Sequence, residues 1–481
     1  LTEDVMQRRF LSDRTMAAYR ELLQERVPVG APVMRRRDGA APERPRRRQG
    51  PDLLRTGEGA GRLSPRCHLV SEGGYCVFAA DNGQTRSSLG RDVITLAEPG
   101  EYQAPAGVSW FFSGAEGVIG LTAAPLYRGD CRYSWEFYDG GAVWTCQRGG
   151  LTARTGLALA RLGSGELRRA ELHWDGEGVL EGELLCYLEP VLCGERDHLA
   201  HPAFSKLFVE SRAIPGGVSF RRRPRGAEEH PVLAALWDGE GSTFTTSRQA
   251  ALGRGGLRAL AGGGPGPLKG ETGAVLDPCL MVRLPVRLRP GESCALRLAL
   301  GVSDRLDAAA DTAQRLLEGR EEPGGMLAPI AQRLGLDQVQ ALGAFALLRH
   351  LASVRPGAEG RPPQCELWQF GISGDLPIAA APLEGGVGED KIGLWCAQHR
   401  FLTRAGWPFD LVFLAEEGGD YRRPLLTAVR EALRALGAES ALGARGGVHL
   451  VDHGEGFPTV LAWASARLPL ELMEEEPEHW T

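Results

Sequence analysis

Residues 166–192, ELRRAELHWDGEGVLEGELLCYLEPVL, carry the strongest structural signal in the chain. Apolar and polar residues alternate on both sides of Asp175 and Gly176. Alternation with a period of two is typical of half-buried strands, and Asp-Gly is a common turn between paired strands. The stretch therefore predicts a β-hairpin.

The same arrangement returns at residues 283–303, RLPVRLRPGESCALRLALGVS, around a turn at Pro290 and Gly291. The residues expected to face a core are Leu284, Val286, Leu288, Leu296, Leu298 and Leu300. Shorter β-prone runs bounded by turn residues, such as GGYCVFAADNG at 73–83, occupy much of the rest of residues 61–303. Many short strands over this length predict one large antiparallel β-sandwich.

After Ser303 the hydrophobic period changes from two to about 3.6 residues, which predicts helices. Residues 304–355 are expected to form a helical linker, and residues 356–481 a small α/β domain with a parallel sheet. The expected strands are 376–383, 409–417 and 446–453, and the expected helices between them are 389–406 and 421–437. Because the period changes near Ser303, we expect the sandwich to fold apart from residues 376–470.

Composition excludes several classes of protein. The 481 residues are 43% hydrophobic and 24% charged, with a formal charge of −6, so we expect no nucleic-acid partner. The ten cysteines show no metal-ligand spacing, which favours reduced, buried thiols in a cytoplasmic protein. We therefore expect no metal and no cofactor.

The start of the chain, LTEDVMQRRF, lacks Met and carries charge where a signal peptide is apolar. Residues 4–26 have helical spacing, and an Arg-, Pro- and Gly-rich stretch that reads as a linker follows them. We expect residues 1–60 to be the end of an upstream domain and this linker, in a piece of a longer protein.

Two motifs of hydrolytic and nucleotide-binding enzymes fail on inspection. GPLKGETGAVLDP (266–278) places Lys269 before Gly270, the reverse of a phosphate-binding loop. Gly371-Ile372-Ser373-Gly374 has the wrong spacing for a nucleophile elbow and precedes a strand instead of following one.

Three segments carry candidate carbohydrate-binding residues. HPAFSKLFVE (201–210) mixes aromatic, hydroxyl and charged side chains, as sugar sites do, and its alternative is a strand with a packed loop. LWQFGISGDLPI (367–378) is either a binding loop or architecture, and Glu416 with Glu417 either lines a ligand site or favours the dipole of the following helix. The candidates are His201, Phe204, Lys206, Trp368, Ser373, Asp375 and Glu416.

We interpret LWQFGISGDLPI as architecture. Gly371 and Gly374 allow a tight turn with positive φ, and Ser373 or Asp375 can hydrogen-bond the backbone. Trp368 and Phe370 are expected to anchor the turn on the linker helices.

HPAFSKLFVE, GETGAVLDP and LWQFGISGDLPI, in this order, resemble the family of cyclic β-1,2-glucan synthases and cellobiose phosphorylase-like glycoside phosphorylases. The resemblance extends to DLVFLAEEGGDYRRPL, and MQRRFLSD resembles the tail of the glycoamylase-type domain that precedes the sandwich in the synthases. It implies a β-supersandwich, a β-glucan or oligosaccharide partner, and flanking catalytic α/α barrels. Arg86 lies where the family's sandwich often has an aromatic-rich stretch.

In this family the catalytic carboxylates lie on the barrels, so the resemblance implies no catalytic residue in this chain. It implies a non-catalytic, carbohydrate-associated region of a parent enzyme that is cytoplasmic or associated with the cytoplasmic face of a membrane. The alternative is a self-sufficient glycoside phosphorylase or glycosyltransferase that uses Asp375, Glu416 or Glu417 as its acid. A homodimer is left open.

Overall fold

The computed structural model describes residues 50–61, 65–95, 107–224, 226, 229–262, 268–352, 361–383, 389–415, 423–452 and 454–469. The helix and Arg-rich linker predicted before residue 50 lie outside the described residues, as do Glu416 and Glu417.

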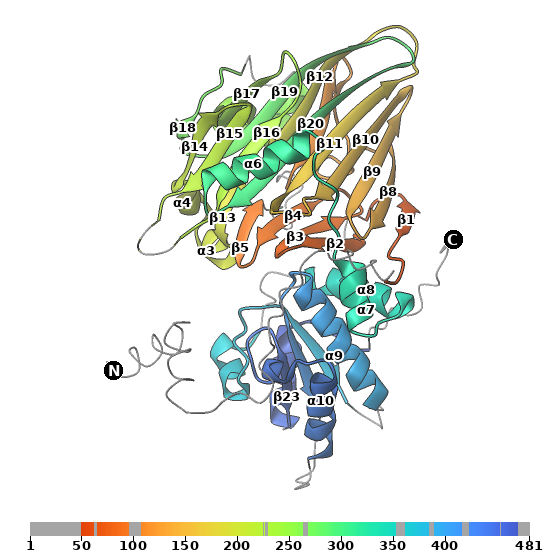
Figure 1. The fold of residues 1–481 in the computed structure, drawn as a ribbon, viewed down its shortest axis with the longest axis vertical. Coiled ribbons are helices and arrows are strands. Elements are labelled where there is room, and N and C mark those ends of the chain that lie inside the picture. Colours follow the sequence, from red (N-terminus) through yellow and green to blue (C-terminus); the bar gives the residue numbers. More distant parts are fainter. Residues whose placement is uncertain are drawn as a thin grey trace, which may run out of the picture. The chain divides into compact units, whose positions relative to one another are not determined.

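Most of residues 55–303 form three antiparallel sheets (Figure 1). The ten-stranded sheet has the order β1 (Arg55–Glu58), β8 (Arg132–Tyr138), β9 (Gly141–Arg148), β10 (Leu151–Leu159), β11 (Ser164–Trp174), β20 (Glu292–Ser303), β16 (Val232–Trp237), β15 (Gly217–Arg222), β14 (Val209–Ile214) and β18 (Gly273–Ala274). A five-stranded sheet has the order β17 (Thr243–Ser247), β19 (Pro278–Leu288), β12 (Leu180–Leu188), β6 (Ser109–Gly114) and β7 (Gly117–Gly120). The third has the order β13 (Pro190–Gly194), β5 (Asp92–Thr95), β4 (Thr85–Leu89), β3 (Tyr75–Ala80) and β2 (Cys67–Glu72). The predicted antiparallel sandwich is confirmed.

Both predicted hairpins are wrong, although their strands exist. β11 pairs with β20 in the ten-stranded sheet, whereas β12 pairs with β19 in a five-stranded sheet. The turns after Trp174 and Leu288 therefore carry the chain from one sheet to another. Alternation shows which residues face a core, but a hairpin and a turn between two packed sheets produce the same alternation.

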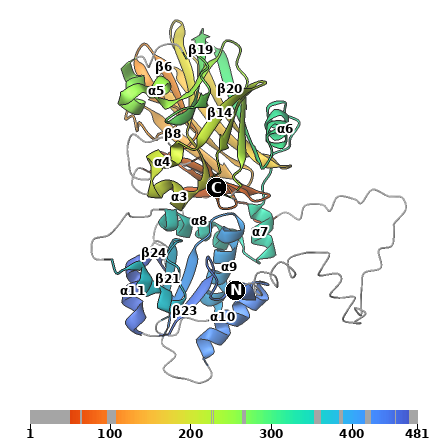
Figure 2. The same ribbon diagram turned by 90° about the vertical axis from the view of Figure 1, so that its left-hand side faces the viewer.

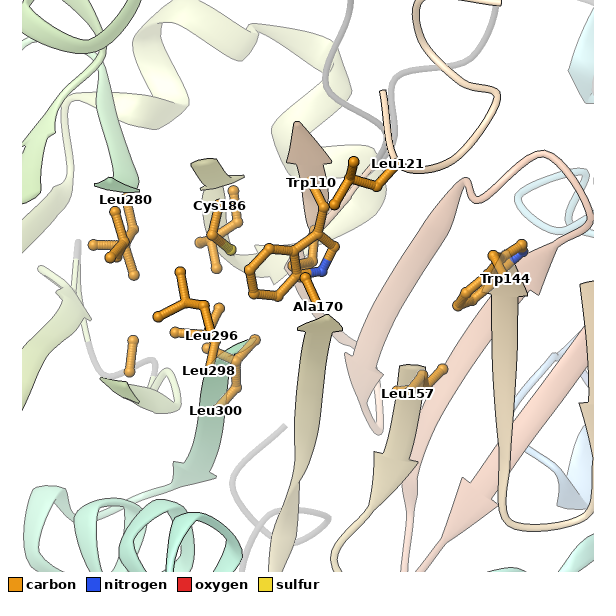
Figure 3. Close-up of a cluster of buried hydrophobic side chains, with 14 of the residues drawn as sticks. Trp110, Leu121, Trp144, Leu157, Ala170, Cys186, Leu280, Leu296, Leu298 and Leu300 are labelled. Carbon is orange, nitrogen blue, oxygen red and sulfur yellow. The ribbon is translucent and has the colours of Figure 1, made fainter. Parts of the chain in front are cut away.

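The inner faces of these sheets form one hydrophobic core (Figure 3). β20 contributes Leu296, Leu298 and Leu300, each fully buried, as their alternation predicts. The other labelled side chains are Trp110, Leu121, Trp144, Leu157, Ala170, Cys186 and Leu280. Burial of this many large side chains is the main term that stabilises the sandwich.

A charged pair interrupts the apolar inner face of β11. Glu166 accepts hydrogen bonds from Arg168 Nη2 at 2.7 Å and from Ser87 Oγ at 2.7 Å, and Tyr75 Oη lies 3.3 Å away. Ser87 and Tyr75 belong to the sheet of β2–β5, so the carboxylate of Glu166 connects two sheets. Glu166 is 0% exposed and Arg168 2%.

Helix α6 (Leu306–Leu317) covers the outer face of the ten-stranded sheet (Figure 1). Leu167 points outward and packs with Ala313 and Leu316 of this helix. Gly301 allows the close approach, because a Cβ there would lie 1.9 Å from the backbone oxygen of Ala309. Short helices also occur beside β17, namely α5 (Arg248–Leu252) and the 3-10 segment η1 (Gly253–Gly262).

The rest of the chain forms helices and a parallel sheet, as predicted. Helices α7 (Leu327–Arg333) and α8 (Gln338–Ala352) precede the sheet, whose order is β23 (Val448–Val451), β22 (Asp410–Leu414), β21 (Ile378–Pro382) and β24 (Ala464–Arg467). Strand β24 was not predicted from the sequence. The helical segments around the sheet are η2 (Gln364–Phe370), α9 (Glu389–Arg404), α10 (Pro424–Ala435), η3 (Glu439–Ala441), η4 (Gly454–Gly456) and α11 (Phe457–Trp463).

Helices cover both faces of the parallel sheet (Figure 2). Ala379 and Phe413 face α9 and α10, whereas Ala380 and Val412 face η2 and α11. Burial on both faces explains why β21 and β22 are continuous apolar runs instead of alternating ones. Among the described residues, no helix has the length and apolar composition needed to cross a membrane.

Candidate functional site

The segment HPAFSK forms a helix, not the strand with a packed loop that was its alternative interpretation. Helix α3 (Glu195–Ala200) and helix α4 (Pro202–Lys206) lie between β13 and β14 in the chain, beside β13 (Figure 1). Pro202 occupies the first position of α4, where its missing N–H costs no helical hydrogen bond. Only the end of the stretch, from Val209, is a strand.

Lys206 points inward and is held by carboxylates. Its Nζ lies 2.7 Å from Glu189 Oε2 and 3.1 Å from Asp277 Oδ1. Glu189 also accepts hydrogen bonds from Tyr187 Oη at 2.6 Å and Arg248 Nε at 3.2 Å. Burial by itself would lower the pKa of Lys206, but the two carboxylates outweigh it and raise the pKa. Lys206 is therefore a charged anchor of α4 on the sandwich.

Ser205 and His198 form a buried pair that sequence reasoning missed. His198 Nδ1 lies 3.2 Å from Ser205 Oγ, and Cys193 Sγ lies 3.8 Å from the same hydroxyl. Burial lowers the pKa of His198 to about 4, so its imidazole is neutral near pH 7. A serine next to a neutral histidine is a nucleophile-like arrangement, but Ser205 is 2% exposed and His198 3%, which closes the pair to a substrate.

His201 and Phe204 point to the surface instead. Phe204 is 50% exposed, and its ring meets that of Phe208 edge-on at 5.3 Å between centroids. Leu199 and Leu207 are also exposed large apolar side chains of these helices and their flank. We call Leu199, His201, Phe204 and Leu207 the α3–α4 surface.

Two glycines with positive φ and local hydrogen bonds shape the GISGD turn. Gly371 ends η2 with φ 72°, and Gly374 has φ 70°. The Asp375 N–H donates to Ser373 Oγ at 3.2 Å, and Gln364 Nε2 donates to the Ser373 carbonyl at 2.7 Å. These bonds use the polar groups of the turn within the turn itself.

Trp368 and Phe370 are predicted to anchor the turn on the linker helices, and the structure places Phe370 elsewhere. Leu367 is fully buried, and Phe370 packs with α11 and against Gly456, not on the linker helices. Positions three apart share one side of a 3-10 helix, so Leu367 and Phe370 face inward together. Trp368 is left 63% exposed.

A salt bridge joins the GISGD turn to helix α3. Arg196 of α3 pairs with Asp375 Oδ1, which also accepts a hydrogen bond from Gln364 Nε2 at 3.1 Å. Arg445 Nε lies 3.9 Å from the other carboxylate oxygen. Asp375 therefore connects the GISGD turn to the helices that carry Phe204, over a sequence separation that no local motif reveals.

Arg86, which lies where the family's sandwich often has an aromatic-rich stretch, has a structural role. Arg86 pairs with Glu195 of α3 at 2.8 Å, and its guanidinium lies 5.1 Å from the ring centroid of Trp407. The charge of Arg86 thus interacts with Glu195 of α3 and with the ring of Trp407, in the segment after α9.

The comparison with known families agrees with this geometry. Residues 54–318 match the model of the glycosyl hydrolase 94 supersandwich domain. This chain belongs to that family. The family resemblance and the fold predicted from the sequence are thereby confirmed.

The supersandwich chain is also similar to the cyclic beta-(1,2)-glucan synthase NdvB of Rhizobium meliloti (strain 1021). Identity is 27% over 465 residues, which cover 89% of this chain but 16% of that protein. The supersandwich chain thus corresponds to a small part of the length of this relative.

Two solved structures match this chain with low TM-scores. A bacterial glucoamylase complexed with acarbose matches with a TM-score of 0.33 and 10% identity, covering 56% of this chain and 35% of that one. A putative kojibiose phosphorylase from the human microbiome matches with a TM-score of 0.33 and 6% identity, covering 63% and 39%. At these TM-scores the likeness carries no conclusion about function.

The described part of the supersandwich chain contains no group of three or more His, Cys, Asp or Glu side chains placed to hold a metal ion. The candidate site comprises two exposed aromatic side chains, Phe204 on α4 and Trp368 on η2. Lys206 holds α4 on the sandwich, and Asp375 pairs with Arg196 of α3.

Proposed function

We propose that this chain is a non-catalytic, carbohydrate-associated region of a glycosyl-transferring enzyme of the cyclic β-1,2-glucan synthase or β-glucan phosphorylase-like type. The observation that carries the proposal is the match to a glycosyl hydrolase 94 supersandwich together with similarity to a cyclic beta-(1,2)-glucan synthase along 89% of the chain.

The state of the candidate side chains supports a binding role over a catalytic one. Asp375 is engaged by Arg196 and Gln364, and Lys206 by Glu189 and Asp277. A general acid must present its carboxyl oxygens to a substrate, whereas Asp375 Oδ1 already contacts Arg196 and Gln364.

The α3–α4 surface and Trp368 are the proposed contacts to the glucan. Exposed aromatic rings supply large, rigid areas on which the C–H faces of a sugar ring can pack. The largely buried ion pair between Lys206 and Glu189 fixes α4 beneath Phe204, so little conformational entropy is lost there when a ligand binds. The further partners in this proposal are catalytic α/α barrels of the parent protein, and a homodimer is compatible with it.

Calorimetric titration of the chain with β-1,2-glucooligosaccharides tests the proposal. Phe204→Ala and Trp368→Ala should each weaken binding at least about tenfold, which corresponds to about 1.4 kcal/mol. Val339→Ala is the matched control, because Val339 is 74% exposed but lies on α8. Unchanged affinity in both aromatic variants would show that the glucan does not bind at this surface.

A second measurement addresses the non-catalytic part. The chain is incubated with β-1,2-glucooligosaccharides and phosphate, and glucose 1-phosphate and chain length are followed. No turnover is expected. Turnover that disappears in Asp375→Asn or Glu416→Gln would establish the self-sufficient enzyme instead.

A further inference from the structure

Two cysteines meet on the inner face of neighbouring strands. In the β8–β9 pair Tyr133 lies opposite Cys146, and Arg132 lies opposite Gln147. Cys131 is two residues before Tyr133 and therefore shares its face, diagonal to Cys146. Cys131 and Tyr133 pack against the same hydrophobic core that contains Cys146. The register thus places the two thiols beside each other on one face of the strand pair.

The two thiols differ in their access to solvent. Cys146 is 1% exposed, whereas Cys131 is partly exposed at the start of β8. Burial and the neighbouring sulfur thus leave Cys131 as the member of the pair that a small solute can reach. The Cys131 side chain lies 3.9 Å from Asp130 Oδ1.

Cationic groups surround this entrance. Arg148 Nε lies 2.7 Å from Asp130 Oδ2, and Arg128 binds both oxygens of the same carboxylate at 2.9 and 2.8 Å. The neighbouring Cys146 thiol lowers the pKa of Cys131 to about 7, against burial and the Asp130 carboxylate, which both raise it, and Arg148 lowers it further. The contact with Cys131 and burial raise the pKa of Cys146. The exposed sulfur is therefore the one that ionises first, and a thiolate is the form that attacks an oxidant.

We propose that Cys131 and Cys146 form a reversible oxidation site that reacts with hydrogen peroxide or an organic hydroperoxide. Cys131 is the attacking thiolate, and Cys146 is the resolving thiol. No contact of either residue with the α3–α4 surface enters this proposal, so it stands independently of the proposed function.

The chemistry balances in two steps. The Cys131 thiolate attacks the terminal peroxide oxygen, so an S–O bond forms and the O–O bond breaks. The leaving hydroxide, or the alkoxide of an organic hydroperoxide, takes a proton to become water or an alcohol. The Cys146 sulfur, after losing its proton, then attacks the Cys131 sulfenic acid, so the S–S bond forms, the S–O bond breaks, and water leaves. The two thiols supply the two electrons that reduce the peroxide.

The backbone allows the bond to close. Diagonal neighbours in an antiparallel pair have Cα atoms about 7–8 Å apart, slightly beyond the usual range for a disulfide. Cys131, however, precedes the first paired residue of β8, and its N–H makes a single long turn bond of 3.4 Å to the Arg128 carbonyl. Closing the bond requires this segment to shift toward Cys146, and the β8–β9 ladder, which begins at Arg132, can stay paired.

Cys294 is the matched control. It is also partly exposed and packs against the same core, but it lies on β20, with Ala153 and Leu172 between it and Cys146 across the sheet. Burial raises the pKa of Cys294, so it lacks the activation present at Cys131.

The test uses the full, reduced chain treated with hydrogen peroxide, followed by peptide mass spectrometry without reduction. A Cys131–Cys146 cross-linked peptide is expected, and dithiothreitol should reverse it. In Cys146→Ser the sulfenic acid should persist at Cys131 and react with dimedone. Thiol alkylation before oxidation should be at least about tenfold faster at Cys131 than at Cys294, since one pKa unit changes the thiolate fraction about tenfold.

The pH dependence separates this site from general oxidation. The rate of cross-link formation should rise as the pH passes through about 7, the pKa of Cys131. Cross-linked peptides with other pairings only, or dimedone labelling of Cys146→Ser at Cys294 and not at Cys131, would overturn the proposal. Circular dichroism of Cys146→Ser confirms that the variant is folded before the labelling is compared.

Discussion

Gly374 determines the shape of the turn that presents Asp375. Its φ is 70°, and a Cβ on it would lie 2.9 Å from Leu367 Cδ1 and 3.0 Å from Gln364 Cγ. Gly374→Val should lower the free energy of unfolding by more than about 1–2 kcal/mol, because left-handed backbone strain adds to this crowding. Ser373→Ala, which removes one hydrogen-bond acceptor, should cost about 1 kcal/mol. Denaturant unfolding measures both changes.

Gly393→Ala is the control for the variants Gly374→Val and Ser373→Ala. Gly393 lies within α9, and a Cβ there would meet nothing within 4 Å, so the alanine should be neutral or stabilising. If Ser373→Ala left the stability unchanged yet abolished binding of a β-glucan, the GISGD stretch would be a binding loop and not architecture.

His399 makes the stability of the α/β domain depend on pH. It is fully buried, its Nε2 bonds the Phe409 carbonyl at 3.0 Å, and its Nδ1 has no partner among the described groups. Burial lowers the pKa of His399 from 6.5 to about 4. The unfolded chain therefore takes up this proton first, so the stabilisation is fully present above pH 6.5 and is lost as the pH falls toward 4.

The difference between the wild type and His399→Gln isolates this contribution. Unfolding free energies of both proteins are measured from pH 7.5 to about 4. The wild type should lose up to roughly 3 kcal/mol more than the variant across this range, given about 1.4 kcal/mol per pKa unit. Parallel curves would show that His399 is not the group responsible.

The candidate site shows what residue-level reasoning can find. The residue types in HPAFSK and GISGD singled out these segments as candidates, and the positive φ of Gly371 and Gly374 is one that glycine adopts readily. The direction in which each side chain points could not be predicted from the residue types. Lys206 points inward because Glu189 and Asp277, which are distant in sequence, provide its counter-charges. Long-range ion pairs of this kind leave no local pattern.

At the scale of elements, β11 shows why strands were predicted better than their partners. Leu172 and Ala170 face the core as alternation predicts, and the turn at Asp175 is present. Whether the chain then returns in the same sheet depends on which strand supplies the neighbouring hydrogen bonds, and β20 lies about 120 residues later. Helices α6 to α10 were easier to predict because their hydrogen bonds are local.

The charged residues on the inner face of β11 support a prediction about the joint between two sheets. Glu166→Ala leaves the Arg168 guanidinium buried without its carboxylate, and Ser87 and Tyr75 lose their acceptor. The cost should be about 3–5 kcal/mol. The double variant Glu166→Leu/Arg168→Leu should be more stable than Glu166→Ala, since no buried charge remains.

Urea unfolding of the single and double variants measures this coupling. Glu171→Ala is the control, because Glu171 lies on the same strand but faces outward. A loss below about 1 kcal/mol in Glu166→Ala would mean that water reaches the pair and that it does not hold the two sheets together.

At the scale of the whole molecule, the sandwich and the α/β domain share a hydrophobic cluster. Leu69 and Cys76 of the sandwich belong to it, together with Phe345 of α8 and Phe401 of α9. Arg55 adds to the contact, since its guanidinium lies 4.4 Å from the ring centroid of Phe345. The change of hydrophobic period near Ser303 predicted domains that fold apart, but shared burial couples their unfolding, so we expect one calorimetric transition.

Gly406 is the position at which this coupling can be tested. Its φ is 101°, and a Cβ would lie 2.6 Å from Cys76 Cβ, so a side chain there collides with β3. Neighbouring Trp407 packs on Phe78 at 5.2 Å between ring centroids, and the collision should disturb this contact too. Gly406→Val should therefore weaken the contact between the two parts and split the calorimetric transition into two. Gly437→Val is the matched control, because Gly437 has φ 60° with nothing within 4 Å of its Cβ position and so carries the backbone strain without the collision. If both variants kept a single transition with equal losses of stability, the strain at Gly406 alone would account for the effect, and the shared cluster would not depend on the approach of Gly406 to Cys76.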